Sequence, residues 1–273
     1  MYLYENKIKD ISSLKRLKEL ERLYLFENKI EDISSLKRLK NLKDLSLADN
    51  KIENIKSLRG LKNLKYLSLS GNKIENIANL KGLKKLESLN LRENKIKKIE
   101  KTPNLKRLYL RDNNIKKIKK LSELKKIENL DLAGNQLTDV DFLPKDLPNL
   151  ERLELWDNNI SDWSRLSEIK ANKLEELSIF KNKINNVEQI YKIASNFPNL
   201  KRIEVSDNKS YDLEKLGRLV KKLPSLENLD LWYIYHIRNP EYEKLGEIVG
   251  GDIIVQYHPK GTRGVSPYVD ESK

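Results

Sequence analysis

Residues 42–63 read LKDLSLADNKIENIKSLRGLKN, and this arrangement of leucine, asparagine and isoleucine recurs along most of the 273-residue chain. The asparagine marks the period most clearly, because ten copies follow one another at steps of 19 to 26 residues. These copies are Asn6, Asn28, Asn50, Asn72, Asn94, Asn113, Asn135, Asn158, Asn182 and Asn208. A sustained period of this length indicates a solenoid, in which each repeat packs only against its neighbours.

The apolar positions within one repeat predict its local structure. Around Leu23 and Leu25, apolar and polar residues alternate, which is the period of a β-strand. The two leucines are expected to enter the core, whereas Tyr24 and Phe26 face outward. The apolar residues of 30–39 are spaced for a turn or two of 3-10 or α-helix. Each repeat therefore predicts a strand, a turn and a short helical return.

The later repeats are longer and predict α-helices in the return path. Apolar residues recur at helical spacing in 187–194 and 213–223, and Pro198 and Pro224 follow these segments. Because proline cannot continue a helix, we expect both helices to end near it. The asparagines are expected to bond through their amides to turn backbone that would otherwise be buried and unpaired.

The 22-residue pattern L-x-x-L-x-L-x-x-N-x-I-x-x-I-x-x-L-x-x-L resembles a subclass of leucine-rich repeat. That subclass is typified by the nuclear regulatory subunit of protein phosphatase 1 and also occurs in bacterial internalins. The resemblance covers roughly residues 1–233. It implies an α/β fold: a curved solenoid with a parallel β-sheet on its concave face and 3-10 or short α-helices on its convex face. In the phosphatase subunit, aromatic and acidic residues of the concave face grip the enzyme.

The pattern divides the chain into three parts. Residues 1–233 hold about eleven repeats, residues 234–257 predict a C-terminal cap, and residues 258–273 predict a mobile tail rich in Pro, Gly, Ser and charge. Within the cap, we expect a helix over 240–249 and a strand at 253–255. The chain opens inside a repeat without an N-terminal cap. We therefore expect an upstream segment or weak self-association through this open edge.

Composition narrows the classes of function. The chain has no cysteine, so it has no disulfide framework and no thiolate metal site. No apolar run approaches the 18 residues or more of a membrane span, and no signal peptide is recognisable at Met1. Only two histidines occur, and no nucleotide-binding or catalytic motif is present. We expect a cytoplasmic protein, with the nucleus as an alternative, that has no enzyme activity, no metal and no cofactor.

Charge is distributed unevenly. The chain has a net charge of +13, whereas the four outward-facing columns of the predicted sheet sum to −6. The basic residues therefore lie on the edge and back, where Lys7, Lys29, Lys51, Lys73 and Lys95 follow the asparagines. One interpretation is contact with an anionic partner, either RNA or phospholipid head groups. The other is a solvated edge that discourages aggregation.

The candidate partner-binding residues are outward aromatic side chains with acidic neighbours, because rigid aromatic rings are frequent interface anchors and acids attract a basic partner. They are Trp156, Phe180, Trp232, Tyr233, Asp131, Glu154, Glu204, Asp230, Tyr24 and Phe26. Two alternatives stay open. Trp232 and Tyr233 could be covered by the C-terminal tail, and Trp156 could be an isolated exposed ring. Trp163 occupies an apolar repeat position and is expected in the core.

The sequence therefore predicts a protein-binding scaffold that holds its partner, a basic protein or an enzyme, in the concave face. The resemblance suggests a regulatory subunit of a phosphatase or of another enzyme. One alternative is a protein that binds nucleic acid or an anionic surface through its basic edge and convex face. A second alternative is a host-interaction module of the internalin kind.

Overall fold

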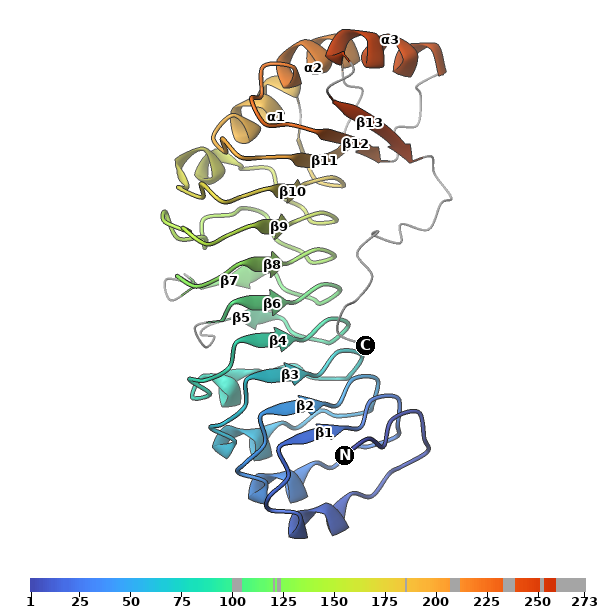
Figure 1. The fold of residues 1–273 in the computed structure, drawn as a ribbon, viewed down its shortest axis with the longest axis vertical. Helices are drawn as coiled ribbons and strands as arrows, with labels where there is room; N and C mark the ends of the chain where they lie inside the picture. Colours follow the sequence, from blue (N-terminus) through green and yellow to red (C-terminus); the bar gives the residue numbers. More distant parts are fainter. Residues whose placement is uncertain are drawn as a thin grey trace.

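The computed structural model describes residues 1–99, 105–119, 121, 124–184, 186–206, 212–232, 239–250 and 253–258. These residues form an elongated solenoid with one sheet of 11 parallel strands, as predicted (Figure 1). The strands are β1 (Arg22–Tyr24), β2 (Asp44–Ser46), β3 (Tyr66–Ser68), β4 (Ser88–Asn90), β6 (Arg107–Tyr109), β8 (Asn129–Asp131), β9 (Arg152–Glu154), β10 (Glu176–Ser178), β11 (Arg202–Ser206), β12 (Asn228–Trp232) and β13 (Ile254–His258). Each strand pairs with the equivalent strand of the adjoining repeat, so one repeat contributes one strand.

Short helical segments lie on the opposite side of the solenoid. Early repeats use 3-10 turns, and η1 to η4 span Ser12–Arg16, Ser34–Arg38, Lys56–Gly60 and Ala78–Leu80, with η5 at Ser164–Glu168. In the middle, β5 (Lys98–Ile99) and β7 (Lys117–Ile118) form a second, two-stranded sheet behind the main one (Figure 1).

The longer repeats contain the predicted α-helices. Helices α1 (Val187–Ala194) and α2 (Leu213–Val220) end a few residues before Pro198 and Pro224. Both are capped at the start, because the side chains of Asn186 and Asp212 accept hydrogen bonds from backbone amides three residues later.

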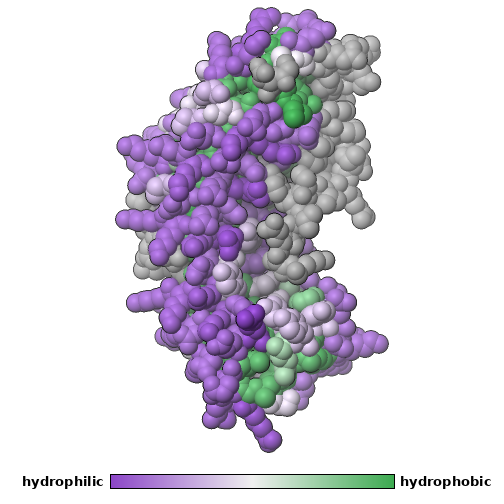
Figure 2. Space-filling view, viewed as in Figure 1, coloured by the Kyte–Doolittle hydropathy of each residue, from purple (hydrophilic) through white to green (hydrophobic). Residues whose placement is uncertain are grey.

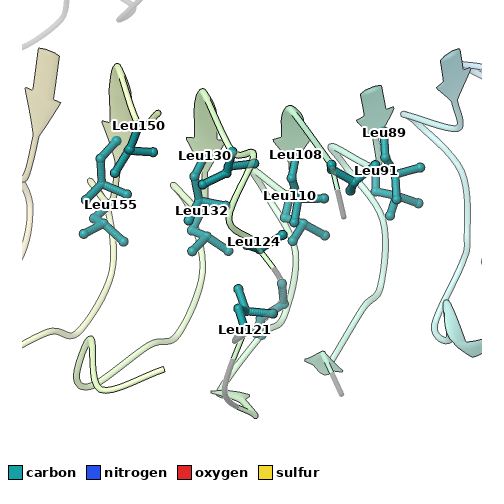
Figure 3. Packing of buried hydrophobic residues seen from close by; sticks show 14 of the residues in the cluster. Leu89, Leu91, Leu108, Leu110, Leu121, Leu124, Leu130, Leu132, Leu150 and Leu155 are labelled. Atoms are coloured by element: carbon teal, nitrogen blue, oxygen red, sulfur yellow. The ribbon is translucent and has the colours of Figure 1, made fainter. Parts of the chain in front are cut away.

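The core is a set of leucine rows that run through the repeats. Figure 3 shows the paired strand leucines, such as Leu89 with Leu91 and Leu108 with Leu110, lying side by side from repeat to repeat. Trp163 is buried in this core, as predicted. Its indole N–H has no hydrogen-bond acceptor among the described residues.

The asparagine ladder forms the predicted spine. The Asn72 amide donates to the carbonyl oxygens of Leu47, Leu69 and Ser70 at 2.9, 3.1 and 3.0 Å. Its side-chain oxygen accepts a hydrogen bond from the backbone amide of Ile52 at 2.9 Å. Because Leu47 and Ile52 belong to the preceding repeat, Asn72 joins two repeats, and the ladder side chains from Asn28 to Asn182 all do so. The last predicted ladder residue, Asn208, lies outside the described residues.

The residue before each described ladder asparagine has a left-handed backbone, which the periodicity does not predict. The acidic residues at this position are predicted to form the fourth outward column of the sheet. The structure places them in the turn that follows the strand. Those with positive φ, between 50° and 55°, are Glu5, Glu27, Asp49, Glu93, Asp112, Asp157 and Lys181. Gly71 and Gly134 occupy the same position with φ of 60° and 59°. The turn thus imposes a conformation that glycine adopts most easily.

The C-terminal end has the predicted order of helix and strand. Helix α3 (Asn239–Val249) packs on α2, and β13 pairs in parallel with β12, so that Ile254 lies opposite Asn228. Strand β13 continues to His258, one residue beyond the predicted cap of 234–257. The rest of the predicted tail lies outside the described residues. Within the described residues, no helix is long and apolar enough to cross a lipid bilayer.

Candidate functional site: the concave face

The strand side chains that point away from the leucine core form columns across the sheet. Register places Arg22 beside Asp44 and then Tyr66, and Tyr24 beside Ser46 and then Ser68. Because each column uses one residue per repeat, neighbouring members are separated by the strand spacing of about 4.8 Å. A column of rings or charges therefore brings its members into contact.

At the N-terminal end this face displays an aromatic patch, defined by the contacting rings of Tyr2, Tyr4, Tyr24 and Phe26 and by Tyr66, which lies two strands further along in the neighbouring column. The Tyr2 and Tyr24 rings stack with centroids 4.9 Å apart, and the Tyr4 and Phe26 rings stack at 4.4 Å. Tyr2 is 67% exposed and Tyr66 is 42% exposed. In Figure 2 this end of the molecule, at the bottom of the view, is pale to green against a purple surround. The patch is thus both ordered and accessible.

Small hydroxyl side chains surround the aromatic patch. The neighbouring outward positions include Ser46, Ser68, Ser70 and Ser88, together with Ala48 and the Arg22–Asp44 ion pair. Burial, together with the nearby Asp44 carboxylate, raises the pKa of the Tyr24 hydroxyl. Since its ordinary pKa is already 10.0, this phenol is neutral at physiological pH. The first repeats therefore present tyrosine and serine with few charges.

In the C-terminal half, Trp156 and Phe180 come together as the columns predict, but they do not project as contact residues. Their rings stack at 5.0 Å, and the Arg111 guanidinium lies 4.6 Å from the Trp156 ring centroid. Ala133 lies between Arg111 and Trp156 in the column, and its small side chain lets the arginine reach across. Trp156 is only 9% exposed and Phe180 only 6%. The expectation of projecting rings, including an isolated Trp156, was wrong, because rings one strand apart cover each other.

The acidic neighbours are also buried, and Asp131 illustrates the reason. Arg92 donates to Asp131 Oδ2 from Nη2 at 2.9 Å and from Nε at 3.0 Å. The same guanidinium lies 4.7 Å from the Tyr109 ring centroid. Burial raises the pKa of Asp131, and Arg92 opposes this shift. A residue that was expected to attract a partner is thus already paired within the protein.

Glu154 lies in the same buried column. Burial raises its pKa to about 8, and the negative charges of Asp131 and Glu204 act in the same direction. The Trp156 indole N–H donates to Glu154 Oε2 at 3.4 Å. This carboxyl therefore holds its proton at neutral pH and contributes no charge to the face.

Further along the sheet, Arg202 contacts the two remaining acids, Asp230 and Glu204. Its Nε lies 2.6 Å from Asp230 Oδ2 and 3.4 Å from Glu204 Oε1. Ser178 Oγ donates to Glu204 Oε2 at 2.7 Å. Burial raises the pKa of Glu204, partly offset by the Ser178 hydrogen bond, and Asp230 is 0% exposed.

These contacts correct the prediction that Asp131, Glu154, Glu204 and Asp230 form an accessible acidic surface. The prediction considers each column alone, whereas Arg92 and Arg202, which pair with these acids, stand in adjacent columns. A signal was present, since Arg92 and Arg202 each lie one or two strands from the acid that they bind.

Two predicted site residues have no described side chain. Trp232 is the last residue of β12, and Tyr233 lies outside the described residues. Whether these rings are exposed or covered stays a prediction. Within the part of the chain that the structure describes, no group of three or more His, Cys, Asp or Glu side chains is placed to hold a metal ion. The hollow lined by Arg152, Glu154 and Ser178 has a volume of only about 10 Å³.

Solved structures with this fold come from bacterial proteins and from a receptor assembly. An internalin of Listeria monocytogenes is 22% identical, with 92% of this chain and 84% of that chain covered and a TM-score of 0.50. A leucine-rich repeat protein of Leptospira interrogans is 23% identical, with coverage of 90% and 74% and a TM-score of 0.58. A chain from an octameric complex of latrophilin 3, Unc5D and the leucine-rich repeats of FLRT2 is 19% identical, with coverage of 96% and 84% and a TM-score of 0.67.

Identities of 19% to 23% show a common fold, but they do not show a common function. No curated protein matches the chain. The sequence family described as "Leucine Rich repeats (2 copies)" matches six overlapping windows: residues 1–38, 18–61, 40–82, 62–102, 103–145 and 126–171. Together the windows cover more than half of the chain. With the strand, turn and asparagine geometry above, they show that the chain belongs to the leucine-rich repeat family.

Proposed function

We propose that this protein is a binding scaffold that holds a protein partner against the concave face of its first repeats. The observation behind this proposal is the aromatic patch, in which the exposed rings of Tyr2 and Tyr4 are held in place by stacking on the half-buried rings of Tyr24 and Phe26. Tyrosine and phenylalanine bury a large area at low cost in conformational entropy, and they are common anchors of protein interfaces.

The surroundings of the patch favour a protein partner over a small ligand. Tyrosine combined with serine is the composition of antibody contact surfaces, where rings supply area and hydroxyls adapt their hydrogen bonds. The patch is open, and its rings stack beside one another. It therefore suits a surface of mixed apolar and polar character.

The C-terminal half of the sheet has a different role in this proposal. There the arginines and carboxylates satisfy one another, as in the pair of Arg92 with Asp131 and the pair of Arg202 with Asp230. Displacing these buried pairs for a partner would leave charges uncompensated, which is costly. This half stiffens the scaffold, and the partner need not be basic.

The test is affinity capture with site variants. A Tyr24→Ser, Tyr66→Ser double variant removes two anchors, while Ile254→Ser serves as a matched control. Ile254 is 56% exposed at the other end of the same sheet. The partner should be retained by wild type and by Ile254→Ser and lost with the double variant. Equal capture by all three, at unchanged melting temperatures, would exclude the first repeats as the contact surface.

The identity of the partner is a further proposal. The repeat resemblance suggests a phosphatase or another enzyme in the cytoplasm or nucleus, and the fold likeness to an internalin is consistent with a host-interaction module as an alternative. Mass spectrometry of proteins captured from cytosol distinguishes the two. A phosphatase catalytic subunit that depends on Tyr24 and Tyr66 supports the first, and its absence from the specific captures contradicts it.

A further inference from the structure

The convex side of the first four repeats concentrates nearly all of the net charge. Segments 12–20, 34–42, 56–64 and 78–86 contain twelve Lys or Arg residues and one carboxylate, Glu19. Their net charge of +11 compares with +13 for the whole chain. We call this surface the cationic ridge; it consists of Lys15, Arg16, Lys18, Lys37, Arg38, Lys40, Lys56, Arg59, Lys62, Lys81, Lys84 and Lys85.

The ridge is arranged in columns that run along the solenoid. One column is Lys15, Lys37, Arg59 and Lys81, and the other is Lys18, Lys40, Lys62 and Lys84, each with a period of 22 residues. Segments η1 to η4, which hold or precede these residues, stack on one another in Figure 1. All twelve cations are exposed, and none forms an ion pair within the described residues. Like charges are thus held close together, with Glu19 as the one carboxylate in these segments and with Asp10 as a neighbour whose pKa is lowered by hydrogen bonds from Ser12 and, less strongly, by the charge of Lys15.

Two glycines help to place the second column. Lys40 Nζ donates to the carbonyl oxygen of Gly60 at 3.4 Å, and Lys62 Nζ donates to that of Gly82 at 3.0 Å. A Cβ atom at Gly60 would lie 2.5 Å from Lys40 Nζ, and one at Gly82 would lie 2.7 Å from Lys62 Nζ. The lysines therefore lie over the next repeat and keep further N–H groups for an outside acceptor.

We propose that the cationic ridge binds the phosphate backbone of single-stranded nucleic acid without sequence preference. A linear array of cations, several ångströms apart, suits a chain of regularly spaced phosphates. The four segments contain no aromatic residue, so nothing on the ridge stacks on bases. Leu17 is their only exposed large apolar side chain, so the ridge lacks the apolar residues that insert into a bilayer.

The lysines on the other edge provide a contrast. Lys51 and Lys73 lie 4.0 and 3.7 Å from Glu31 and Glu53 of the preceding repeats. Charge at these two lysines is therefore locally balanced, whereas no ridge cation forms an ion pair within the described residues. In Figure 2 the lower left of the molecule, where η1 to η4 lie, is hydrophilic. The aromatic patch lies on the strand side of the solenoid and the ridge on its helical side. The ridge and the patch can therefore be tested separately.

The test compares two quadruple variants with the same net charge. The ridge variant carries Lys18→Gln, Lys40→Gln, Lys62→Gln and Lys84→Gln. The control variant carries Lys7→Gln, Lys29→Gln, Lys51→Gln and Lys73→Gln. Each protein is titrated into a fluorescein-labelled oligouridylate of about 20 nucleotides, and anisotropy is followed at several salt concentrations between about 50 and 200 mM. Circular dichroism checks that both variants are folded.

The ridge variant should bind at least about tenfold more weakly than wild type, and the control less than about threefold more weakly. The slope of log K against log salt should become shallower by up to about 3 for the ridge variant, since each phosphate contact contributes about 0.7 for a single strand. Equal weakening of both variants would overturn the proposal, because net charge alone would then explain binding. So would an absence of wild-type binding, or preferential binding to vesicles of phosphatidylserine and phosphatidylcholine.

Discussion

Asn158 shows how a single side chain connects three segments of backbone. Its amide donates to the carbonyl oxygens of Leu132 and Leu155 at 3.0 Å, and its oxygen accepts from the amide of Leu137 at 3.0 Å. These backbone groups are buried, so water cannot replace the asparagine. The ladder residues are therefore needed for polar satisfaction in the turns, although they are surrounded by a leucine core.

Replacing Asn158 with leucine should destabilise the protein. The substitution leaves buried carbonyl and amide groups without partners, which costs on the order of 1–3 kcal/mol. The neighbouring Asn159 is exposed, so Asn159→Leu is a control with the same chemical change in the same turn. Urea unfolding followed by circular dichroism measures both free energies of unfolding. Similar losses for the two variants would contradict the role assigned to the ladder.

Glu154 should make stability depend on pH. Its pKa is about 8 in the folded protein against an ordinary value of 4.5, so between these values the folded state holds a proton that the unfolded state has released. The free energy of unfolding should therefore fall as pH rises from about 4.5 to about 8. Each pKa unit corresponds to about 1.4 kcal/mol.

Glu154→Gln removes this titration and should flatten the fall in melting temperature between pH 5 and 9. Asp131, which pairs with Arg92, and Glu204, which lies beside Arg202, both act on Glu154 and keep their own contributions in the variant. Glu151→Gln, an exposed change in the same repeat, should retain the wild-type dependence. An unchanged pH profile for Glu154→Gln would show that this carboxyl is ionised in the folded state.

At the scale of the element, the repeats keep their strands constant and vary their return paths. Helices α2 and α3 pack closely through Gly217, where a Cβ atom would lie 2.8 Å from Leu245 Cδ1 and 2.9 Å from Ile248 Cγ2. Gly246 on α3 has nothing within 4 Å of an added Cβ. The two glycines thus have opposite environments in neighbouring helices.

Alanine at these two positions should shift stability in opposite directions. Gly246→Ala gains helix propensity, up to about 1 kcal/mol, and meets no obstacle. Gly217→Ala gains the same propensity but forces the α2–α3 interface apart, at a cost of about 1–3 kcal/mol. Thermal melts of both variants measure the difference. Stabilisation by Gly217→Ala would mean that the interface adjusts more easily than its contacts indicate.

The elements predicted from sequence are those whose signal lies within one repeat. Strand positions, the helices ended by Pro198 and Pro224 and the buried place of Trp163 all follow from local periodicity. The burial of Asp131 and Trp156 does not follow from local periodicity, because it depends on contacts with Arg92 and Arg111 from other repeats. Periodicity predicts which face of the sheet a side chain points to. It does not predict whether side chains of neighbouring repeats cover that side chain and bury it.

At the scale of the whole molecule, the protein is close to a one-dimensional object. Each strand contacts only the strands of adjoining repeats, and the leucine rows provide continuity. The free energy of unfolding of such an array is approximately the sum of the intrinsic stabilities of the repeats and the energies of the interfaces between neighbouring repeats. A local defect should therefore be felt most strongly nearby.

Leu89→Ala, in the buried row of β4, should create a cavity that costs about 2–5 kcal/mol. Hydrogen exchange should accelerate most in β3, β4 and β6 and least in β11 and β12. Mass spectrometry of peptides gives this profile along the chain. Uniform acceleration in every strand would show that the solenoid unfolds as a single cooperative unit.

The backward direction of the asparagine bonds has a consequence for how such a chain can change length over evolution. The ladder residues from Asn28 to Asn182 each bond to their own turn and to the repeat before it, as Asn50 does to Leu47 and Leu25. Removing or duplicating one complete 22-residue unit among the equal repeats leaves every junction chemically the same. A fractional insertion breaks a junction. Gene rearrangement can therefore move the aromatic patch and the buried arginine pairs apart or together in whole steps, without redesigning either.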